Sequence, residues 1–487
     1  MPKKRIANNY LYNLVYQVLA IVVPLITTPY LSRVLGAEKI GIYSYTLSIT
    51  TYFILFGSLG IALYGRREIA YVQDDAENRS KSFLEIFTTK CFTLTLSIIL
   101  FYFTFCANGE YGSYYKILLL EIMADMLDIS WFFQGIEDFK KTVSRNVVVK
   151  IVSVICIFVF VRNENDLVTY FVIYVLSNLL GNISLWLYLP KYIKLQKFKE
   201  LNFKKHLKPM FSLFIPQIAT QIYTVLDKTM IGAIIVDKSE VGLYEQSQKI
   251  IKILLTLATS LGTVMMPRIA FSYAKGEVSK IKRYMEKSFS FITMLAFPMM
   301  TGIISISCHF VPIFYGDGFE KVKTLLCVIS PIIIFIGLSN VIGTQYLLPT
   351  KQQKKYTLSV VCGAIVNFGL NLLLIPKYAS VGASIATVIA ELAVTTVQFW
   401  LVRKQISFTS TLKIIAPYFL ASILMFIPSL IIGSCIENHT LSLAIQGTAS
   451  VIIYVATLYI FHDPNLLLIT NKVKHSLAKL LKKLKRN

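Results

Sequence analysis

The chain has 487 residues, of which 55% are hydrophobic and 15% are charged, and its Lys and Arg residues outnumber its Asp and Glu residues by 49 to 26. Soluble domains carry about 25% charged residues, so this composition excludes a soluble multidomain protein, a disordered chain, a coiled coil and a collagen-like rod. The net charge of +23 would suggest nucleic acid as the partner of a soluble protein. In a membrane protein, its meaning depends on where the basic residues lie.

Long apolar segments follow one another along the whole chain, and a membrane-crossing helix needs about 20 such residues. We predict fourteen spans, and therefore an all-α polytopic membrane protein, because a backbone inside lipid must bond within its own helix. The first span follows a basic start and is interpreted as retained, because a signal peptide has a shorter apolar region. The predicted spans are 10–32, 41–63, 83–107, 114–134, 145–161, 167–189, 210–234, 244–266, 288–313, 323–347, 357–375, 380–402, 412–434 and 441–461.

The basic residues are divided unequally between alternate connections. If the N-terminus is cytoplasmic, the segments on that side hold 36 of the 49 Lys and Arg residues and the opposite segments hold 7. This positive-inside pattern predicts that both termini are cytoplasmic. The last segment, 462–487, has Leu and Val at helical spacing between Lys residues, which predicts an amphipathic helix on the anionic membrane surface.

Two short sequence pairs indicate an internal repeat. EKIGIY at 38–43 resembles SEVGLY at 239–244, and FKK at 139–141 resembles QKK at 353–355. We predict two pseudo-symmetric six-span lobes, with the substrate site between the repeats near the middle of the membrane. The predicted organisation is an N-terminal lobe at 1–190, a basic cytoplasmic linker at 191–209, a C-terminal lobe at 210–402, two added spans within 403–461 and the tail at 462–487.

Ionisable residues inside the predicted spans are the candidate site residues. A charge at the centre of a membrane helix costs about 2.5–3.5 kcal/mol, so such a side chain should face a cavity or a partner. On spans four, seven and eight the candidates recur at helical spacing and form single faces. The candidates are Arg33 in span one or at its end, Glu121, Asp125 and Asp128 in span four, Lys150 in span five, Gln217, Gln221 and Lys228 in span seven, Lys249 and Lys252 in span eight, and Glu391 in span twelve.

These residue types point to a polar chamber for an anionic, sugar-bearing substrate. Lys and Arg suit a phosphate, whereas carboxylates and amides suit sugar hydroxyls. Acids can also bind a coupling proton or cation. Two alternatives stay open: the opposite charges pair to hold helices together, and Lys150 and Arg33 extend toward the membrane surface instead of toward a substrate.

Motifs for catalysis and for bound metal are absent from the sequence. There is no GxxxxGK[ST], HExxH or GxSxG pattern, and the seven Cys form no CxxC pair. The sequence therefore predicts a protein that is not an enzyme and that has no cofactor and no metal site.

Three segments carry a family resemblance: TPYLSRVLGAEKIGIYSY at 28–45, YGRREIA at 64–70 and DISWFFQGIEDFKK at 128–141. With them, the whole chain resembles the Wzx-type flippases, the polysaccharide branch of the multidrug/oligosaccharidyl-lipid/polysaccharide exporter superfamily. The resemblance implies translocation of undecaprenyl-pyrophosphate-linked oligosaccharides across the bacterial cytoplasmic membrane, by alternating access, for O-antigen, capsule or exopolysaccharide. It also implies work beside a polymerase and a chain-length regulator, and a cationic central cavity.

The residues then have hypothetical roles. Lys228, Lys249 and Lys252 would contact the diphosphate or acidic sugars, and the acidic candidates would contact sugar or a coupling proton or sodium ion. Three other functions remain as alternatives: a small-molecule/cation antiporter of the same superfamily, a peptidoglycan-precursor flippase, and a membrane-embedded sugar-lipid transferase. Drug/cation antiporters typically keep an acid in the first span, and 10–32 has none.

Overall fold

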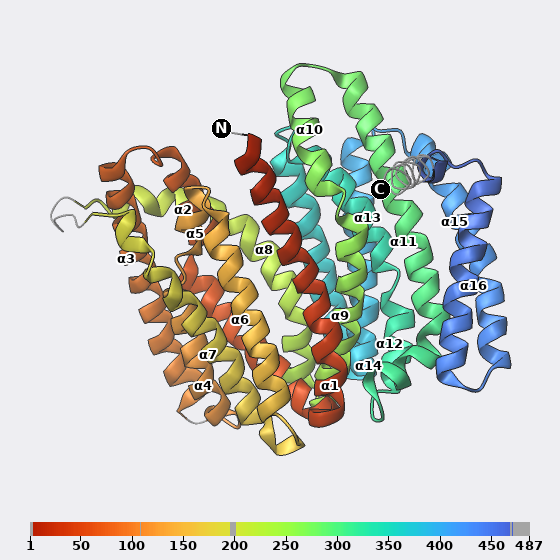
Figure 1. The fold of residues 1–487 in the computed structure, drawn as a ribbon, viewed down its shortest axis with the longest axis horizontal. Coiled ribbons are helices and arrows are strands. Elements are labelled where there is room, and N and C mark those ends of the chain that lie inside the picture. The colour runs from red at the N-terminus through yellow and green to blue at the C-terminus, as the bar shows by residue number, and fades with distance from the viewer. Residues whose placement is uncertain (1–2, 108, 195–200, 468–469, 471–487) are drawn as a thin grey trace, which may run out of the picture. The chain divides into compact units, whose positions relative to one another are not determined.

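The computed structural model describes residues 3–107, 109–194, 201–467 and 470. Every regular element in this part of the chain is a helix (Figure 1). The all-α class predicted from the sequence is therefore confirmed. The predicted amphipathic helix of the tail lies almost wholly in 471–487, outside the described residues, and so does 195–200 of the predicted linker.

Packing divides the chain into two compact units, Met1–Glu245 and Gln246–Asn487. The two predicted lobes were defined by the internal sequence repeat, whereas these units are defined by packing. The lobes therefore stay a prediction. The helices of the first unit are α1 (Lys3–Ser58), α2 (Ile61–Tyr71), α3 (Ala76–Phe101), α4 (Gly112–Met126), α5 (Ser130–Gly135), α6 (Phe139–Phe160), α7 (Leu167–Trp186), α8 (Lys204–Ile234) and the start of α9 (Ser239–Thr259).

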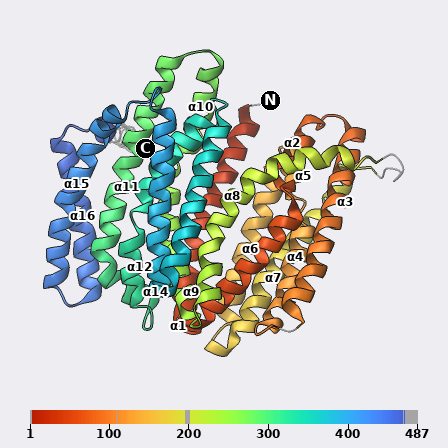
Figure 2. The ribbon, with the colours of Figure 1, turned by 180° about the vertical axis from the view of Figure 1, so that it is seen from behind.

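The second unit contains the rest of α9 and the longer helices of the C-terminal half, seen from both sides in Figures 1 and 2. Its helices after α9 are α10 (Gly262–Ala274), α11 (Val278–Tyr315), α12 (Lys321–Ile329), α13 (Ile332–Ser339), α14 (Gln353–Val402), α15 (Phe408–Cys435) and α16 (His439–Ile460), with a π-helical segment, Asn340–Leu347, between α13 and α14. Within this unit, α11 packs against α15 and α16, and α13 packs against α14.

Helix length and apolarity confirm a multi-pass membrane protein. Within the described residues, nine helices are long and apolar enough to cross a membrane, or ten if the bent pair of α9 and α10 counts as one span. Two of the nine cover 51 and 50 residues, Ile21–Tyr71 and Gln353–Val402. One crossing needs about 20 residues, so each of these two is long enough for two crossings.

The two longest helices are broken at their middles by single residues. In α1 the break is at Gly36, with φ 72° and ψ 172°, and in α14 it is at Ala379, with φ 50° and ψ −127°. Glycine adopts a positive φ without steric cost, whereas alanine pays for it. Both breaks lie between segments that the sequence predicts as separate spans, which explains how one helix supplies two crossings.

The predicted end of span four is wrong. Span four was expected to reach residue 134, but α4 ends at Met126 and a separate short helix, α5, begins at Ser130. Asp128 lies in the break, where its carboxylate accepts hydrogen bonds at 2.9 Å from both the backbone N–H and the hydroxyl of Ser130. A side chain bonded to the backbone two residues ahead favours a turn over a continuing helix. Asp128 therefore does not extend the acidic face of α4.

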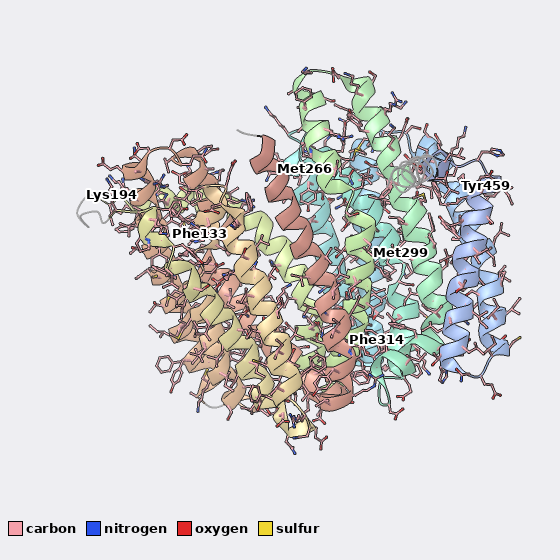
Figure 3. All side chains as sticks on the ribbon, viewed as in Figure 1. Phe133, Lys194, Met266, Met299, Phe314 and Tyr459 are labelled. Carbon is pink, nitrogen blue, oxygen red and sulfur yellow. The ribbon has the colours of Figure 1, made fainter. Side chains whose placement is uncertain are left out.

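Apolar side chains both fill the core and cover the outside. Inside the first unit, Trp131, Phe132 and Phe133 of α5 are buried in a cluster with residues of α2 and α3. On the second unit, Val451 and Tyr459 of α16 are 63% and 64% exposed, and Figure 3 shows Tyr459 on the outside of that helix. Exposed apolar patches of this kind mark contact with another apolar phase, which fits a surface that faces lipid.

Candidate functional site

An acid and three aromatic hydroxyls meet inside the first unit. The ring of Tyr43 on α1 lies 4.7 Å from that of Tyr170 and 5.6 Å from that of Tyr174, both on α7. On the neighbouring α4, Glu121 accepts hydrogen bonds from the Asn178 amide at 2.9 and 3.2 Å. Carboxylate, amide and phenol groups are the partners that sugar hydroxyls use. Glu121 is thus held by an amide on the neighbouring helix.

The predicted cation Lys228 is ion-paired. Its Nζ on α8 lies 3.0 Å from Oε2 of Glu245 at the start of α9, and the two side chains are 17% and 16% exposed. Beside this pair, the Tyr244 hydroxyl donates to Asp227 at 2.5 Å. A partly buried pair of this kind lowers the cost of holding either charge in the membrane.

The other two predicted acids serve a network that joins helices. Asp125 forms an ion pair with Lys90 of α3 at 3.4 Å, and accepts a hydrogen bond at 2.5 Å from Ser58 of α1. Asp128 faces Arg145 of α6 at 3.8 Å. These contacts fit the alternative in which opposite charges hold the bundle together. Lys90, 4% exposed at its side chain, was not singled out in the sequence, although a lysine inside an apolar span was a usable signal.

Lys249 and Lys252 follow Glu245 on one face of α9, one and two turns further along the helix. Lys249 is partly buried and Lys252 is exposed. Among the remaining predicted residues, Arg33 and Gln221 are exposed and Lys150 is partly buried. The backbone of Gln217 lies in α8, but its side chain is outside the described part of the structure.

Glu391 belongs to a separate polar stripe inside the second unit. It is 7% exposed, on a face of α14 that also carries the buried side chains of Ser384 and Gln398. The amide of Gln398 donates to the Ser359 hydroxyl at 3.1 Å, which joins the two arms of α14. The polar stripe is thus buried inside this unit, and Glu391 is its ionisable member.

The two copies of the sequence repeat touch each other through glycines. A Cβ added at Gly41 would meet the carbonyl oxygen of Lys238 at 1.7 Å, and one added at Gly242 would meet that of Ala37 at 2.0 Å. Gly41 and Gly242 occupy the same place in EKIGIY and SEVGLY. The contact is therefore reciprocal, as at a pseudo-twofold axis, and only residues without a side chain allow the backbones to approach so closely.

A fully buried polar triad fastens the start of α8 to the first unit. The Tyr64 hydroxyl lies 2.6 Å from Nδ1 of His206, and Nε2 of His206 lies 2.7 Å from the Glu85 carboxylate. The same carboxylate pairs with Lys205 at 2.7 Å and accepts from the Asn202 N–H at 2.7 Å. The triad links α2, α3 and α8 at the end of the basic linker.

We expect His206→Ala to destabilise the protein strongly. Removing the imidazole leaves the buried Tyr64 hydroxyl without its partner and takes one partner from the buried Glu85 carboxylate, and such a loss costs about 1–3 kcal/mol for each group. The thermal midpoint of the purified protein in detergent should fall clearly below that of the wild type. Lys208→Ala, a change at an exposed residue of the same helix, is the control. Equal thermal midpoints for the two variants would contradict a stabilising role of the triad.

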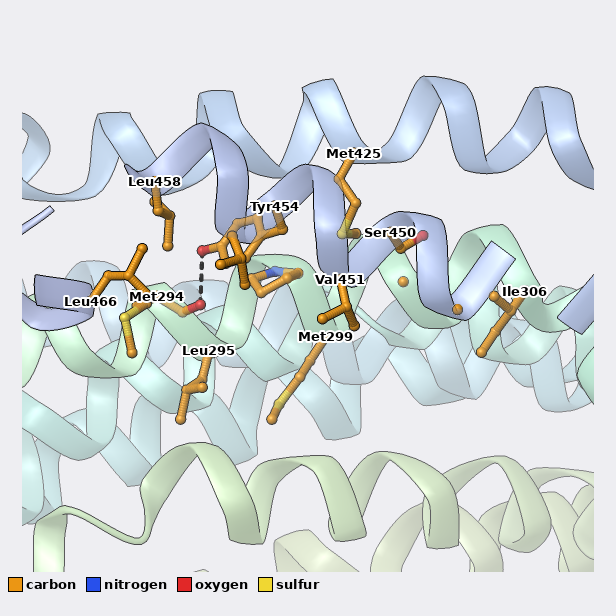
Figure 4. Close-up of a pocket in the computed structure, with 14 residues that line it drawn as sticks. Met294, Leu295, Met299, Ile306, Met425, Ser450, Val451, Tyr454, Leu458 and Leu466 are labelled. Atoms are coloured by element: carbon orange, nitrogen blue, oxygen red, sulfur yellow. Dashed lines mark hydrogen bonds between the residues drawn. The ribbon is translucent and has the colours of Figure 1, made fainter. Parts of the chain in front are cut away.

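The second unit has an apolar cavity of about 410 Å³ beside α11 and α16 (Figure 4). Its lining includes Ser450 and Tyr454 and is otherwise almost wholly apolar. Within the described residues, no group of three or more His, Cys, Asp and Glu side chains could hold a metal ion.

Comparison with known families identifies the family. A model described as polysaccharide biosynthesis protein matches residues 6–272, more than half of the chain. The chain belongs to this family. A second model, described as MatE, matches residues 213–373, in the middle of the chain.

Individual relatives of this polysaccharide biosynthesis protein are distant in sequence. An Escherichia coli K12 protein named "Putative O-antigen transporter" is 23% identical over 406 residues, which cover 82% of this chain and 97% of that protein. A Staphylococcus aureus protein named "Capsular polysaccharide biosynthesis protein CapF" is 23% identical over 397 residues, 79% and 96% of the two chains. The solved structure of the lipid II flippase MurJ, inward closed, has a TM-score of 0.74 at 16% identity over 94% of this chain and 99% of that one. It has the same fold.

Proposed function

We propose that this protein is a flippase that moves undecaprenyl-pyrophosphate-linked oligosaccharide units across the bacterial cytoplasmic membrane, for O-antigen, capsule or exopolysaccharide synthesis. Membership of the polysaccharide biosynthesis family supports the pathway. The observation that carries the chemistry is the row of ionisable side chains on α9, where Glu245 pairs with Lys228 and is followed on the same face by Lys249 and Lys252. Cations at this depth suit an anionic diphosphate.

The roles divide by chemistry. Lys228, Lys249 and Lys252 bind the diphosphate or acidic sugars, while Glu121, with its amide partner and nearby tyrosines, binds sugar hydroxyls. Glu391 is available to a coupling proton or sodium ion. The polyprenyl tail stays in the lipid. The protein acts by alternating access, without catalysis and without a cofactor.

The same proposal includes location and partners. The distribution of Lys and Arg favours cytoplasmic positions for both termini. A flippase so oriented would receive its lipid-linked oligosaccharide on the cytoplasmic side and deliver it to a polysaccharide polymerase and a chain-length regulator on the other. Membrane lipids surround it, and no nucleic acid is involved.

The test is the double variant Lys249→Ala with Lys252→Ala. We expect it to abolish surface polysaccharide and to accumulate the lipid-linked oligosaccharide, while the amount of protein in the membrane stays at the wild-type level. Each hydrogen bond between a lysine and the diphosphate contributes about 1.5–3 kcal/mol. Losing two of them is enough to lower the affinity for the substrate roughly a hundredfold. Surface staining and extraction of the lipid-linked intermediate measure both effects.

Two further double variants sharpen this test. Lys282→Ala with Lys287→Ala removes two exposed lysines from the first turns of α11 and should leave surface polysaccharide unchanged. Lys249→Arg with Lys252→Arg keeps the charges and should retain most activity. Full polysaccharide in the double alanine variant on α9 would remove the assignment of these lysines.

A further inference from the structure

The three helices α11, α15 and α16 pack against one another in the second unit, and one face of α16 is unexpectedly polar. His439, Ser442, Gln446 and Ser450 recur on it at helical spacing, and Tyr454 continues the row. Ser442 and Gln446 are 0% exposed and Ser450 is 7% exposed. A helix added to a membrane bundle can pack with apolar residues alone, so this face calls for a physical reason.

Four polar atoms on this face have no hydrogen-bond partner within the described structure. They are Oγ of Ser442, both side-chain amide atoms of Gln446 and Oγ of Ser450. Buried polar side-chain atoms are nearly always bonded to protein or to ordered water, and a bare one costs free energy. Three such side chains in a row along one helix therefore offer groups to which water can bond.

One end of the row is closed by a pair of histidines. Nδ1 of His309 on α11 lies 2.8 Å from Nδ1 of His439, and Nε2 of His309 lies 3.0 Å from the carbonyl oxygen of Gly433. The carbonyl can only accept, so His309 donates from Nε2 and its Nδ1 accepts from His439. Nε2 of His439 then takes up a proton without breaking this bond. His439 is exposed and His309 is 8% exposed, so the pair leads from water into the bundle.

The other end is closed by a buried carboxylate. Asp463, 6% exposed, accepts a hydrogen bond at 2.6 Å from the Tyr418 hydroxyl of α15. That hydroxyl lies 2.5 Å from the Ser290 hydroxyl of α11, and the amide of Asn465 donates to the Ser290 hydroxyl at 2.6 Å. A titratable group is thus built into each end of the same three-helix bundle.

The spacing between the two ends suits transfer along hydrogen bonds. The 22 residues of α16 extend about 33 Å, close to the roughly 30 Å of a hydrocarbon core. Side chains four residues apart are about 6 Å apart along the axis, a gap that one bridging water can cover with two hydrogen bonds. Toward the Asp463 end, the Tyr454 hydroxyl donates to the carbonyl oxygen of Met294 at 2.8 Å (Figure 4).

We propose that the polar face of α16 is a hydrated proton path that joins the His309–His439 pair to Asp463. Only N–H and O–H bonds form and break along it, and each proton that enters at one end is matched by one that leaves at the other. The neighbouring cavity is lined by Ser450 and Tyr454 of this row and is otherwise almost wholly apolar, so the groups that can bond water lie on the face of α16. The proposal is independent of which lipid-linked substrate the protein carries.

The test measures proton uptake into vesicles that contain the purified full-length protein and a trapped pH-sensitive dye. A potassium gradient with valinomycin supplies an inside-negative potential. We expect the wild type to take up protons at least about tenfold faster than protein-free vesicles, and Gln446→Leu to fall to nearly the protein-free rate, because an apolar side chain in the row excludes water. Val451→Leu, on the exposed side of α16, is the matched control and should behave as the wild type.

Further variants separate the path from a folding defect. Gln446→Ser keeps a polar group and leaves room for water, so it should retain at least about half of the wild-type rate. Ser442→Ala with Ser450→Ala removes two hydroxyls with little change in packing and should slow uptake clearly. Uptake by the wild type no faster than by protein-free vesicles would overturn the proposal, as would equal rates in the wild type and Gln446→Leu. Loss of uptake in Gln446→Ser as complete as in Gln446→Leu would overturn it too.

Discussion

Gly41→Ala is expected to reduce surface polysaccharide about tenfold or more. The new methyl group would lie 1.7 Å from the carbonyl oxygen of Lys238, and a backbone atom cannot turn aside as a flexible side chain can. Overpacking of this kind costs about 1–3 kcal/mol, and every 1.4 kcal/mol changes an equilibrium tenfold. The contact joins equivalent points of the two repeats, so a flippase that works by alternating access would lose a state that depends on their close approach.

The reciprocal position provides a second measurement. Gly242→Ala would bring a methyl group to 2.0 Å from the carbonyl oxygen of Ala37 and should have an effect of similar size. Gly369→Ala is the control, because a Cβ at Gly369 has no atom within 4 Å. Wild-type polysaccharide from cells with Gly41→Ala, at matched protein levels, would show that the close approach of the repeats is not required.

Lys90→Met is expected to lower the amount of folded protein instead of blocking transport specifically. The Lys90 side chain is 4% exposed, pairs with Asp125, and donates to the backbone carbonyl oxygens of Asp125 and Asp128. Removing one partner of a buried ion pair costs about 3–5 kcal/mol, comparable to a large part of the stability of a typical protein. Membrane protein levels and the thermal midpoint in detergent should both fall.

A double variant tests the physical reason. Lys90→Met with Asp125→Asn removes both charges and should recover part of the lost stability, because an uncompensated, partly buried carboxylate is no longer left behind. Recovery should be incomplete, since the two backbone carbonyls still lack the lysine. Lys116→Met, an exposed change on α4, is the matched control. A full loss of export with unchanged stability in Lys90→Met would assign Lys90 to the substrate instead.

These expectations separate two kinds of intramembrane charge. Lys90 acts on folding, so its loss should reduce protein level and activity together. Lys249 and Lys252 are proposed to act on substrate, so their loss should reduce activity alone. In the sequence all three are lysines in apolar spans, and the structure gives Lys90 its partners on α4 and in the turn after it.

Hydropathy is a local property, and the sequence alone was sufficient to predict the class of fold that depends on it. Apolar runs of about 20 residues predict a multi-pass helical membrane protein, which the helices confirm. The repeat of EKIGIY as SEVGLY also marks the two segments that meet at Gly41 and Gly242, although the sequence does not reveal that they touch.

Pairing across helices was decided only by the tertiary structure, because helical spacing identifies a face and not the helix opposite it. Asp125 contacts Lys90, which lies 35 residues away in the sequence, and Glu121 accepts from Asn178, which lies 57 residues away. The end of α4 before Asp128 also escaped the sequence pattern, because a local side-chain hydrogen bond to Ser130 overrides the apolar run. The distribution of the basic residues thus predicts the topology of the chain, while packing determined the partners of Lys90 and Lys228.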